Sequence, residues 1–310
     1  MDILDVVYSE PTVSFHEYRL ERMIIKYCNQ NNIYYYHDEF GMLWLNVKTE
    51  KDIRQSKLLL VSHLDHPGIE IINSDTGKWL GGGQPNLENT LIKVFNEDKI
   101  GYGQILNMIY KNTYKVKVPS FAKAGCLWYK ELPKGYQIKD NTIYTYAADD
   151  LIMVAALLEA VKYNKSYTVL LTRAEEFNLT GINKVLSNGK LDKNITKVIV
   201  LDTTHQTLDI NIGSGIVLRF GDSEVLYNVW MTKKIEDELK RLNLKYIKHR
   251  LYWGITEASA FMEHNFKVGS IALSVENQHN RNYEGKSSPE KVSVDDFKEL
   301  IQFLKQIDLK

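Results

Sequence analysis

The sequence predicts an α/β fold in which a central sheet lies between two layers of helices and a small β domain is inserted. Continuous apolar runs, such as residues 57–62, are typical of strands covered on both faces. Helix-like and strand-like segments alternate over most of the chain, but residues 74–141 lack long helical periodicity. We therefore expect a three-layer α/β/α host, residues 1–73 and 142–310, and a β-rich insert at 74–141.

The N-terminal part of the host begins with a predicted amphipathic helix. Apolar side chains recur at three- and four-residue spacings within residues 17–31. Two stretches rich in β-branched and aromatic residues follow, at 33–36 and 42–47, and a polar turn separates them. Each stretch predicts a short strand, and the apolar run at 57–62 predicts a buried one.

The sequence pattern of the predicted insert differs from that of the host. A glycine run at 81–83 precedes short alternating stretches at 91–95, 104–110 and 114–118. Alternation of this kind over a few residues predicts strands with one buried face. We therefore expect a small antiparallel β domain here.

After the insert, helices and strands alternate again. The longest apolar run, residues 151–161, predicts a buried helix, since it is about half the ~20 residues needed to cross a bilayer and Glu159 interrupts it. Ser293, with Asp296 three residues later, predicts the start of the last helix through an approximate capping box. The other expected elements are helices at 150–163, 181–187 and 233–242 and strands at 167–172, 197–201 and 270–275.

Composition narrows the classes of partner. The 310 residues include 39 Lys+Arg and 39 Asp+Glu, so the formal net charge is zero. Nucleic acid and membrane surfaces are therefore not expected partners, because both need a broad basic field. Cys28 and Cys126 are far apart, and the acidic N-terminus has neither the bases nor the apolar stretch of an export signal. We expect a cytoplasmic protein without a disulfide framework.

Histidine and acidic side chains recur where the predicted apolar strands end, which is the edge where open α/β sheets bind ligands. Singly, each has a structural explanation: aspartates at a helix start can act as caps, and adjacent glutamates are often solvated. Together they offer the imidazole nitrogens and carboxylates that two divalent ions need. The residues are His63, Asp65, Asp149, Asp150, Glu175, Glu176, Asp202 and His279.

The chemistry suggests a division of roles. Asp149 would bridge two metal ions, with His63 and Asp202 on one ion and Glu176 and His279 on the other.

The two remaining acids would act beside the ions. Asp65 would hold the outer ring nitrogen of His63 and so fix the orientation of that ligand. Glu175, not bound to metal, would take a proton from the attacking water and pass it to the leaving amine. Both glutamates can serve the site because they lie past the strand end.

At these residues the chain resembles the M42 family of metallo-aminopeptidases, in the clan of dinuclear zinc exopeptidases that also holds the M20 and M28 families. The 84 residues between Asp65 and Asp149 leave room for an insert where M42 enzymes carry one. Departures stand at His66, Leu151 and Asn178, where the family usually has an acid, an arginine and a glycine. Further similar segments are 14–17, 38–41, 213–215, 256–259 and 289–292.

The resemblance implies a zinc-exopeptidase-like catalytic domain and two divalent ions, zinc with cobalt or manganese as alternatives. It also implies short peptides as substrates and a homo-oligomer formed through the insert, which would act as a lid and oligomerisation domain.

The expected function is metal-dependent release of N-terminal amino acids from short peptides. A deacylase or carboxypeptidase on the same site is the nearest alternative. A glycosidase needs only two carboxylates and would leave His63 and His279 without a role. A noncatalytic peptide-binding protein would leave Glu175 and the ligand set unexplained.

Overall fold

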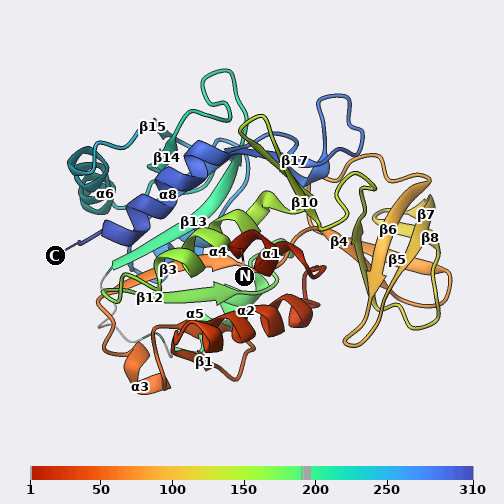
Figure 1. The fold of residues 1–310 in the computed structure, drawn as a ribbon, viewed down its shortest axis with the longest axis horizontal. Coiled ribbons are helices and arrows are strands. Elements are labelled where there is room, and N and C mark those ends of the chain that lie inside the picture. Colours follow the sequence, from red (N-terminus) through yellow and green to blue (C-terminus); the bar gives the residue numbers. More distant parts are fainter. Residues whose placement is uncertain (1, 190, 192–196, 310) are drawn as a thin grey trace.

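The computed structural model describes residues 2–189, 191 and 197–309, and its larger body is built on an eight-stranded sheet (Figure 1). Four neighbouring strands at its centre, β12, β3, β13 and β16, are parallel, so their carboxyl ends meet at one edge. The strand order is β1 (Tyr35–His37), β2 (Leu43–Leu45), β12 (Thr168–Thr172), β3 (Leu58–His63), β13 (Lys197–His205), β16 (Lys267–Val275), β14 (Ile216–Arg219) and β15 (Tyr246–His249).

Helices cover both faces of this sheet, which confirms the predicted three-layer architecture. Alternate side chains of each strand point to opposite faces, so Leu60 packs in one core and Leu59 in the other. The first core contains α1 (Ile3–Tyr8), α2 (Tyr18–Gln30), α4 (Ala148–Ala160), α6 (Val229–Arg241) and α8 (Val294–Gln306). The second contains α3 (Glu50–Ile53), α5 (Thr180–Ser187) and α7 (Glu257–Glu263). Helix α4 is buried along nearly its whole length, as its apolar sequence predicts.

A six-stranded barrel projects from one end of the host (Figure 1). Its neighbouring strands are antiparallel, and side chains such as Trp79, Ile92 and Ile105 fill its core. The strands, in order around the barrel, are β4 (Gly68–Ile71), β5 (Thr76–Leu80), β8 (Thr113–Lys117), β7 (Ile100–Tyr110), β6 (Thr90–Phe95) and β9 (Ala124–Leu127).

The barrel strands run from residue 68 to residue 127, whereas we expected an insert at 74–141. The reason is long-range pairing. Strands β10 (Tyr136–Lys139) and β11 (Thr142–Thr145) form a separate sheet with β17 (Glu290–Ser293), a strand of the host. Because β17 lies about 150 residues further along the chain, its pairing with β11 cannot be predicted from the local sequence pattern.

The last helix begins as predicted but is capped differently. Ser293 Oγ accepts a hydrogen bond from the backbone N–H of Asp296 at 3.3 Å. The Asp296 carboxylate does not return it, and instead accepts from the N–H groups of Gly213 at 2.7 Å and Gly215 at 3.0 Å. Only half of the expected capping box forms, because the acid holds a neighbouring loop. Among the described residues, no helix is long and apolar enough to span a membrane.

Candidate metal centre

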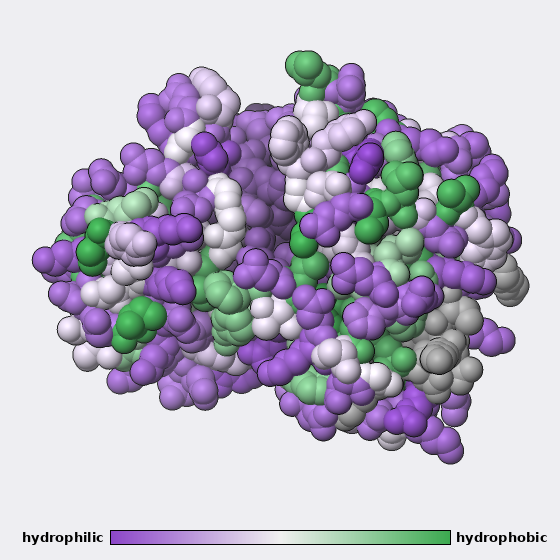
Figure 2. All heavy atoms as spheres, turned by 180° about the vertical axis from the view of Figure 1, so that it is seen from behind, coloured by the Kyte–Doolittle hydropathy of each residue, from purple (hydrophilic) through white to green (hydrophobic). Residues whose placement is uncertain are grey.

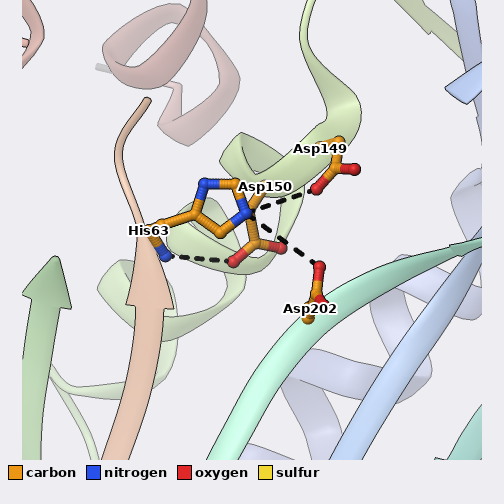
Figure 3. Close-up of side chains that lie close together, drawn as sticks. All are labelled: His63, Asp149, Asp150 and Asp202. Carbon is orange, nitrogen blue, oxygen red and sulfur yellow. Dashed lines mark hydrogen bonds and ion pairs between the residues drawn. The ribbon is translucent and has the colours of Figure 1, made fainter. Parts of the chain in front are cut away.

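The predicted site residues converge at the carboxyl edge of the central strands. Three overlapping groups of side chains could each hold a metal ion, because within each group the potential ligand atoms lie within 4.8 Å of one another. These groups are His63, Asp149, Asp150 and Asp202; His63, Glu175 and Glu176; and Asp149, Glu176 and His279. Figure 3 shows the first group: the ring of His63 faces the carboxylates of Asp149 and Asp202, and the backbone nitrogen of His63 meets the carboxylate of Asp150.

Asp202 lies inside its strand rather than after it. We expected the strand to end at residue 201, but β13 continues to His205 because β16 pairs with it up to Val275. The Asp202 side chain nevertheless faces His63 (Figure 3).

Asp149 lies between the two histidines. Its Oδ1 is 3.4 Å from Nε2 of His63, and its Oδ2 is 3.4 Å from Nε2 of His279. On one side, Oδ1 of Asp202 lies 4.0 Å from His63 Nε2. On the other, Oε1 of Glu176 lies 3.0 Å from His279 Nε2. The arrangement has two halves that share Asp149, as a bridging carboxylate requires.

Backbone carbonyls fix the outer nitrogens of both histidines. Nδ1 of His63 lies 3.1 Å from the carbonyl oxygen of Asp65, and Nδ1 of His279 lies 2.9 Å from that of Gly82. In each ring Nδ1 therefore donates, and Nε2 presents its lone pair to the site. We expected the Asp65 carboxylate to hold His63; its Oδ1 lies within ion-pair distance of Nδ1 at 3.6 Å, and the Asp65 carbonyl oxygen is the nearer acceptor.

The Asp65 carboxylate orders the loop after β12. It is fully buried and accepts hydrogen bonds from Ser14 Oγ at 2.7 Å and from the N–H groups of Glu175 at 2.9 Å and Glu176 at 3.1 Å. These contacts hold both glutamates beyond strand geometry, so adjacent side chains can reach one site. Oε2 of Glu175 lies 4.0 Å from Nε2 of His63.

The electrostatics are those of a cation site. Burial raises the pKa of Glu175 well above its usual range; His63 opposes the shift, and the neighbouring acids Glu176 and Asp202 add to it. Burial would also raise the pKa of Asp149, but electrostatic interaction with the His279 and His63 rings, when these carry a proton, holds that pKa well below normal. Oδ1 of Asp149 is buried without a hydrogen-bond partner among the described residues. A divalent ion would satisfy that oxygen and offset the clustered charge, so the donor set fits two such ions.

Several supporting residues were not assigned from the sequence. Asp150 Oδ2 accepts from Ser62 Oγ and, at 3.2 Å, from the N–H of His63. Glu290 Oε2 accepts from the N–H of Asp149 at 3.0 Å. The segment 289–292 signalled Glu290 through the family resemblance. Asp150 was visible as a neighbour of Asp149 but had no stated role.

Two further charged side chains are buried beside the centre. Glu257, in the resembling segment 256–259, is 1% exposed, and burial raises its pKa to about 7. Arg219 is fully buried and donates to Asp202. In the sequence, Arg219 stands out only as a charged residue directly after the apolar stretch 216–218.

The three departures from the family pattern leave the ligands in place. His66 Nδ1 lies 2.6 Å from the backbone oxygen of Asp149. Leu151 packs in the first core. Asn178 has a φ of 59°, in the left-handed region that glycine and asparagine adopt most readily. Asparagine therefore suits a position where the family commonly has glycine.

A cavity of about 670 Å³ opens beside His279, between the barrel and the host. Gly83 lines it from the barrel side, and Trp253 and Tyr283 line it from the host side. Figure 2 shows a hollow with a hydrophilic floor between the two parts. A small molecule or a peptide end has access to the centre from here.

The fold matches solved structures along nearly the whole chain, at identities that establish the fold alone. The TET1 peptidase of Pyrococcus horikoshii is 18% identical with a TM-score of 0.79, covering 98% of this chain and 97% of that one. A TET aminopeptidase from a marine sediment thaumarchaeote is 14% identical, with a TM-score of 0.77 and coverages of 98% and 94%. A Thermotoga maritima protein named endoglucanase is 17% identical, with a TM-score of 0.69 and coverages of 97% and 95%.

Sequence comparison identifies the family. No curated protein sequence matches the chain. The family model described as M42 glutamyl aminopeptidase matches residues 132–303, more than half of the chain. That region contains Asp149, the two glutamates, Asp202 and His279. The chain therefore belongs to the M42 peptidase family, and it is a hydrolytic exopeptidase.

Proposed function

We propose that this protein is a metal-dependent aminopeptidase that releases N-terminal amino acids from short peptides and uses two divalent ions, zinc in the first instance and cobalt or manganese as alternatives. The observation that carries the proposal is the position of Asp149, which presents one carboxylate oxygen to each of two histidines at 3.4 Å. His63 and Asp202 would hold one ion with it, and Glu176 and His279 the other.

The residues around the ions have separable tasks. When bound, the two ions would polarise the scissile carbonyl and acidify a water molecule. Glu175 would take the proton of the attacking water and deliver it to the leaving amine. Asp65 would keep Glu175 in place through its hydrogen bond to the Glu175 N–H.

The test is release of amino acids from unblocked short peptides by chelator-stripped protein, with zinc, cobalt or manganese added back. Glu175→Gln keeps the size and removes the base, so we expect turnover to fall by at least ~10²-fold. Glu263→Gln, at an exposed position on α7, is the control for a lost carboxylate. Unchanged turnover of Glu175→Gln would overturn the mechanism.

Substrates with a blocked amine separate the alternatives. An aminopeptidase requires the free N-terminal amine, whereas a deacylase or carboxypeptidase of the same clan cleaves N-blocked substrates. Sugar release that persists in a chelator would indicate a glycosidase instead. A peptide-binding protein without catalysis would retain peptides without releasing any amino acid.

We also propose that copies of the chain assemble through the barrel, as an oligomerisation domain, and that the protein is cytoplasmic. Exposed apolar side chains on β7 support the first proposal: Tyr102 is 57% exposed, Ile109 55% and Tyr110 74%. The P. horikoshii TET1 peptidase assembles into a tetrahedron or an octahedral shell. Two buried, free cysteines are consistent with a reducing compartment. Sedimentation of the wild type against Tyr110→Ser, and fractionation of cells, test the two proposals.

A further inference from the structure

Arg219, the last residue of β14, brings a permanent positive charge to one half of the candidate metal centre. Its side chain is fully buried, and Nη1 donates to Oδ2 of Asp202 at 2.9 Å. Nη2 donates to the backbone oxygen of Thr203. Nε has no hydrogen-bond partner among the described residues. An arginine stays protonated in such surroundings, so the charge cannot be shed to relieve the burial.

The topology of the sheet makes this contact possible. Strands β13 and β14 do not pair with each other, because β16 lies between them. Ala272 of β16 pairs with Asp202 on one side and Val217 on the other, and Ser270 pairs with Arg219. The two small side chains on β16 leave room for the guanidinium to cross the strand and reach the carboxylate.

The hydrogen bonds of Asp202 limit what it can give a metal ion. Oδ2 faces the guanidinium. Oδ1 accepts from the N–H of Thr203 at 2.6 Å and is the oxygen 4.0 Å from His63 Nε2. Since each carboxylate oxygen has two lone pairs, one lone pair on Oδ1 remains for the ion.

The other half of the centre has a neutral competitor in place of a charged one: Nε2 of Gln278 donates to Oδ2 of Asp149 at 2.5 Å. In the part of the chain that the structure describes, neither lysine nor arginine forms an ion pair with Glu176 or Asp149; their charged partners are His63 and His279. The fixed charge is therefore paired directly only on the His63 and Asp202 side, and its weaker, longer-range interaction with Asp149 is shared by both halves.

We propose that Arg219 makes the two halves unequal, so that the ion held by His63 and Asp202 binds more weakly than the ion held by Glu176 and His279, and the two load in sequence. This inference rests on the proposed dinuclear centre. A charge within ~4–6 Å changes an ionisation constant by about 10- to 1000-fold, and we expect the two zinc affinities to differ on that scale.

The experiment is a zinc titration of the chelator-stripped full chain by calorimetry with a competing chelator. The wild type should show one tight and one weak site. Arg219→Gln keeps an amide donor for Asp202 and removes the charge, so the weak site should tighten at least about tenfold. Arg219→Lys keeps the charge, and its weak site should stay weak. Arg19→Met removes another largely buried arginine, paired with Glu10 at 2.6 Å, and should change neither site.

A second measurement leaves Arg219 untouched and decides the question even if its variants do not fold. His63→Ala should retain the tight site, and His279→Ala only the weak one. The reverse assignment, equal affinities in the wild type, or a Gln variant with unchanged affinities would each overturn the inference while leaving the proposed function intact. A wild type that binds no zinc, cobalt or manganese would overturn the proposed centre itself, and this inference with it.

Discussion

Replacing Asp65 with asparagine tests whether the buried carboxylate organises the loop that carries Glu175. The carboxylate accepts three hydrogen bonds, from Ser14 Oγ, Glu175 N–H and Glu176 N–H. In Asp65→Asn one oxygen becomes an amide group, which can meet the Ser14 hydroxyl but not a backbone N–H. Each hydrogen bond to a charged group contributes ~1.5–3 kcal/mol. Losing one and weakening two should therefore lower the free energy of unfolding by ~2–4 kcal/mol.

The assay separates this loss from metal binding. Urea unfolding of chelator-treated protein measures stability alone, and Ser14→Ala, which removes a single bond, should lose only ~1–2 kcal/mol. Amino acid release with saturating metal measures function, where we expect Asp65→Asn to lose at least ~10-fold in turnover because outer partners of a metal site commonly matter by 10–100-fold. An Asp65→Asn protein that unfolds at the wild-type urea concentration and keeps wild-type turnover would refute the reasoning.

Two further predictions concern packing and pH. In Gly181→Ala the new methyl carbon would lie 1.9 Å from the backbone oxygen of Arg173, so we expect a loss of ~1–3 kcal/mol in urea unfolding and reduced turnover, since the displaced segment leads into Glu175. Gly82→Ala, with nothing within 4 Å, is the control for stability and should unfold at the wild-type urea concentration. Hydrogen bonds from two lysines lower the pKa of Glu236 from 4.5 to about 2, so its stabilisation of ~1 kcal/mol is present above pH 4.5 and is lost as the pH falls toward 2. The two lysines are Lys240 and Lys248. The difference in unfolding temperature between wild type and Glu236→Gln should vanish as the pH falls over that interval, and a difference that stays constant would contradict the lowered pKa of Glu236.

The host sheet and the convergence of its ligands were predictable because both follow from local pattern. Buried parallel strands are continuous apolar runs, and residues at their carboxyl ends meet whatever the loops do. Strands β14 and β15, helix α7 and the short strand β17 were not predicted, because they are four to seven residues long and owe their structure to partners far along the chain.

The contacts that orient the proposed metal ligands were harder to predict from the sequence. The glycine run at 81–83 indicated no contact with a metal ligand, yet the carbonyl of Gly82 accepts from His279, 197 residues later. We predicted that the Asp65 side chain contacts His63. The backbone oxygen of Asp65 is the nearer acceptor for His63, and the Asp65 side chain also holds the loop that carries the two glutamates. Residue type and spacing say which side chains can bind a metal, but the partners of those side chains are set by the tertiary fold.

The balance of charge in the whole chain conceals a local excess, and the proposed ions would offset most of it. Eight acids lie at or beside the centre with one fixed cation, Arg219, so seven negative charges would remain if every acid were ionised and the ligand histidines neutral. Buried carboxylates cannot all stay ionised without cations nearby. Two divalent ions would offset four of these charges. Protons on the carboxyl groups whose pKa burial raises, Glu175 among them, would offset the rest, and accepting a proton is the task proposed for Glu175. The eight acids are Asp65, Asp149, Asp150, Glu175, Glu176, Asp202, Glu257 and Glu290.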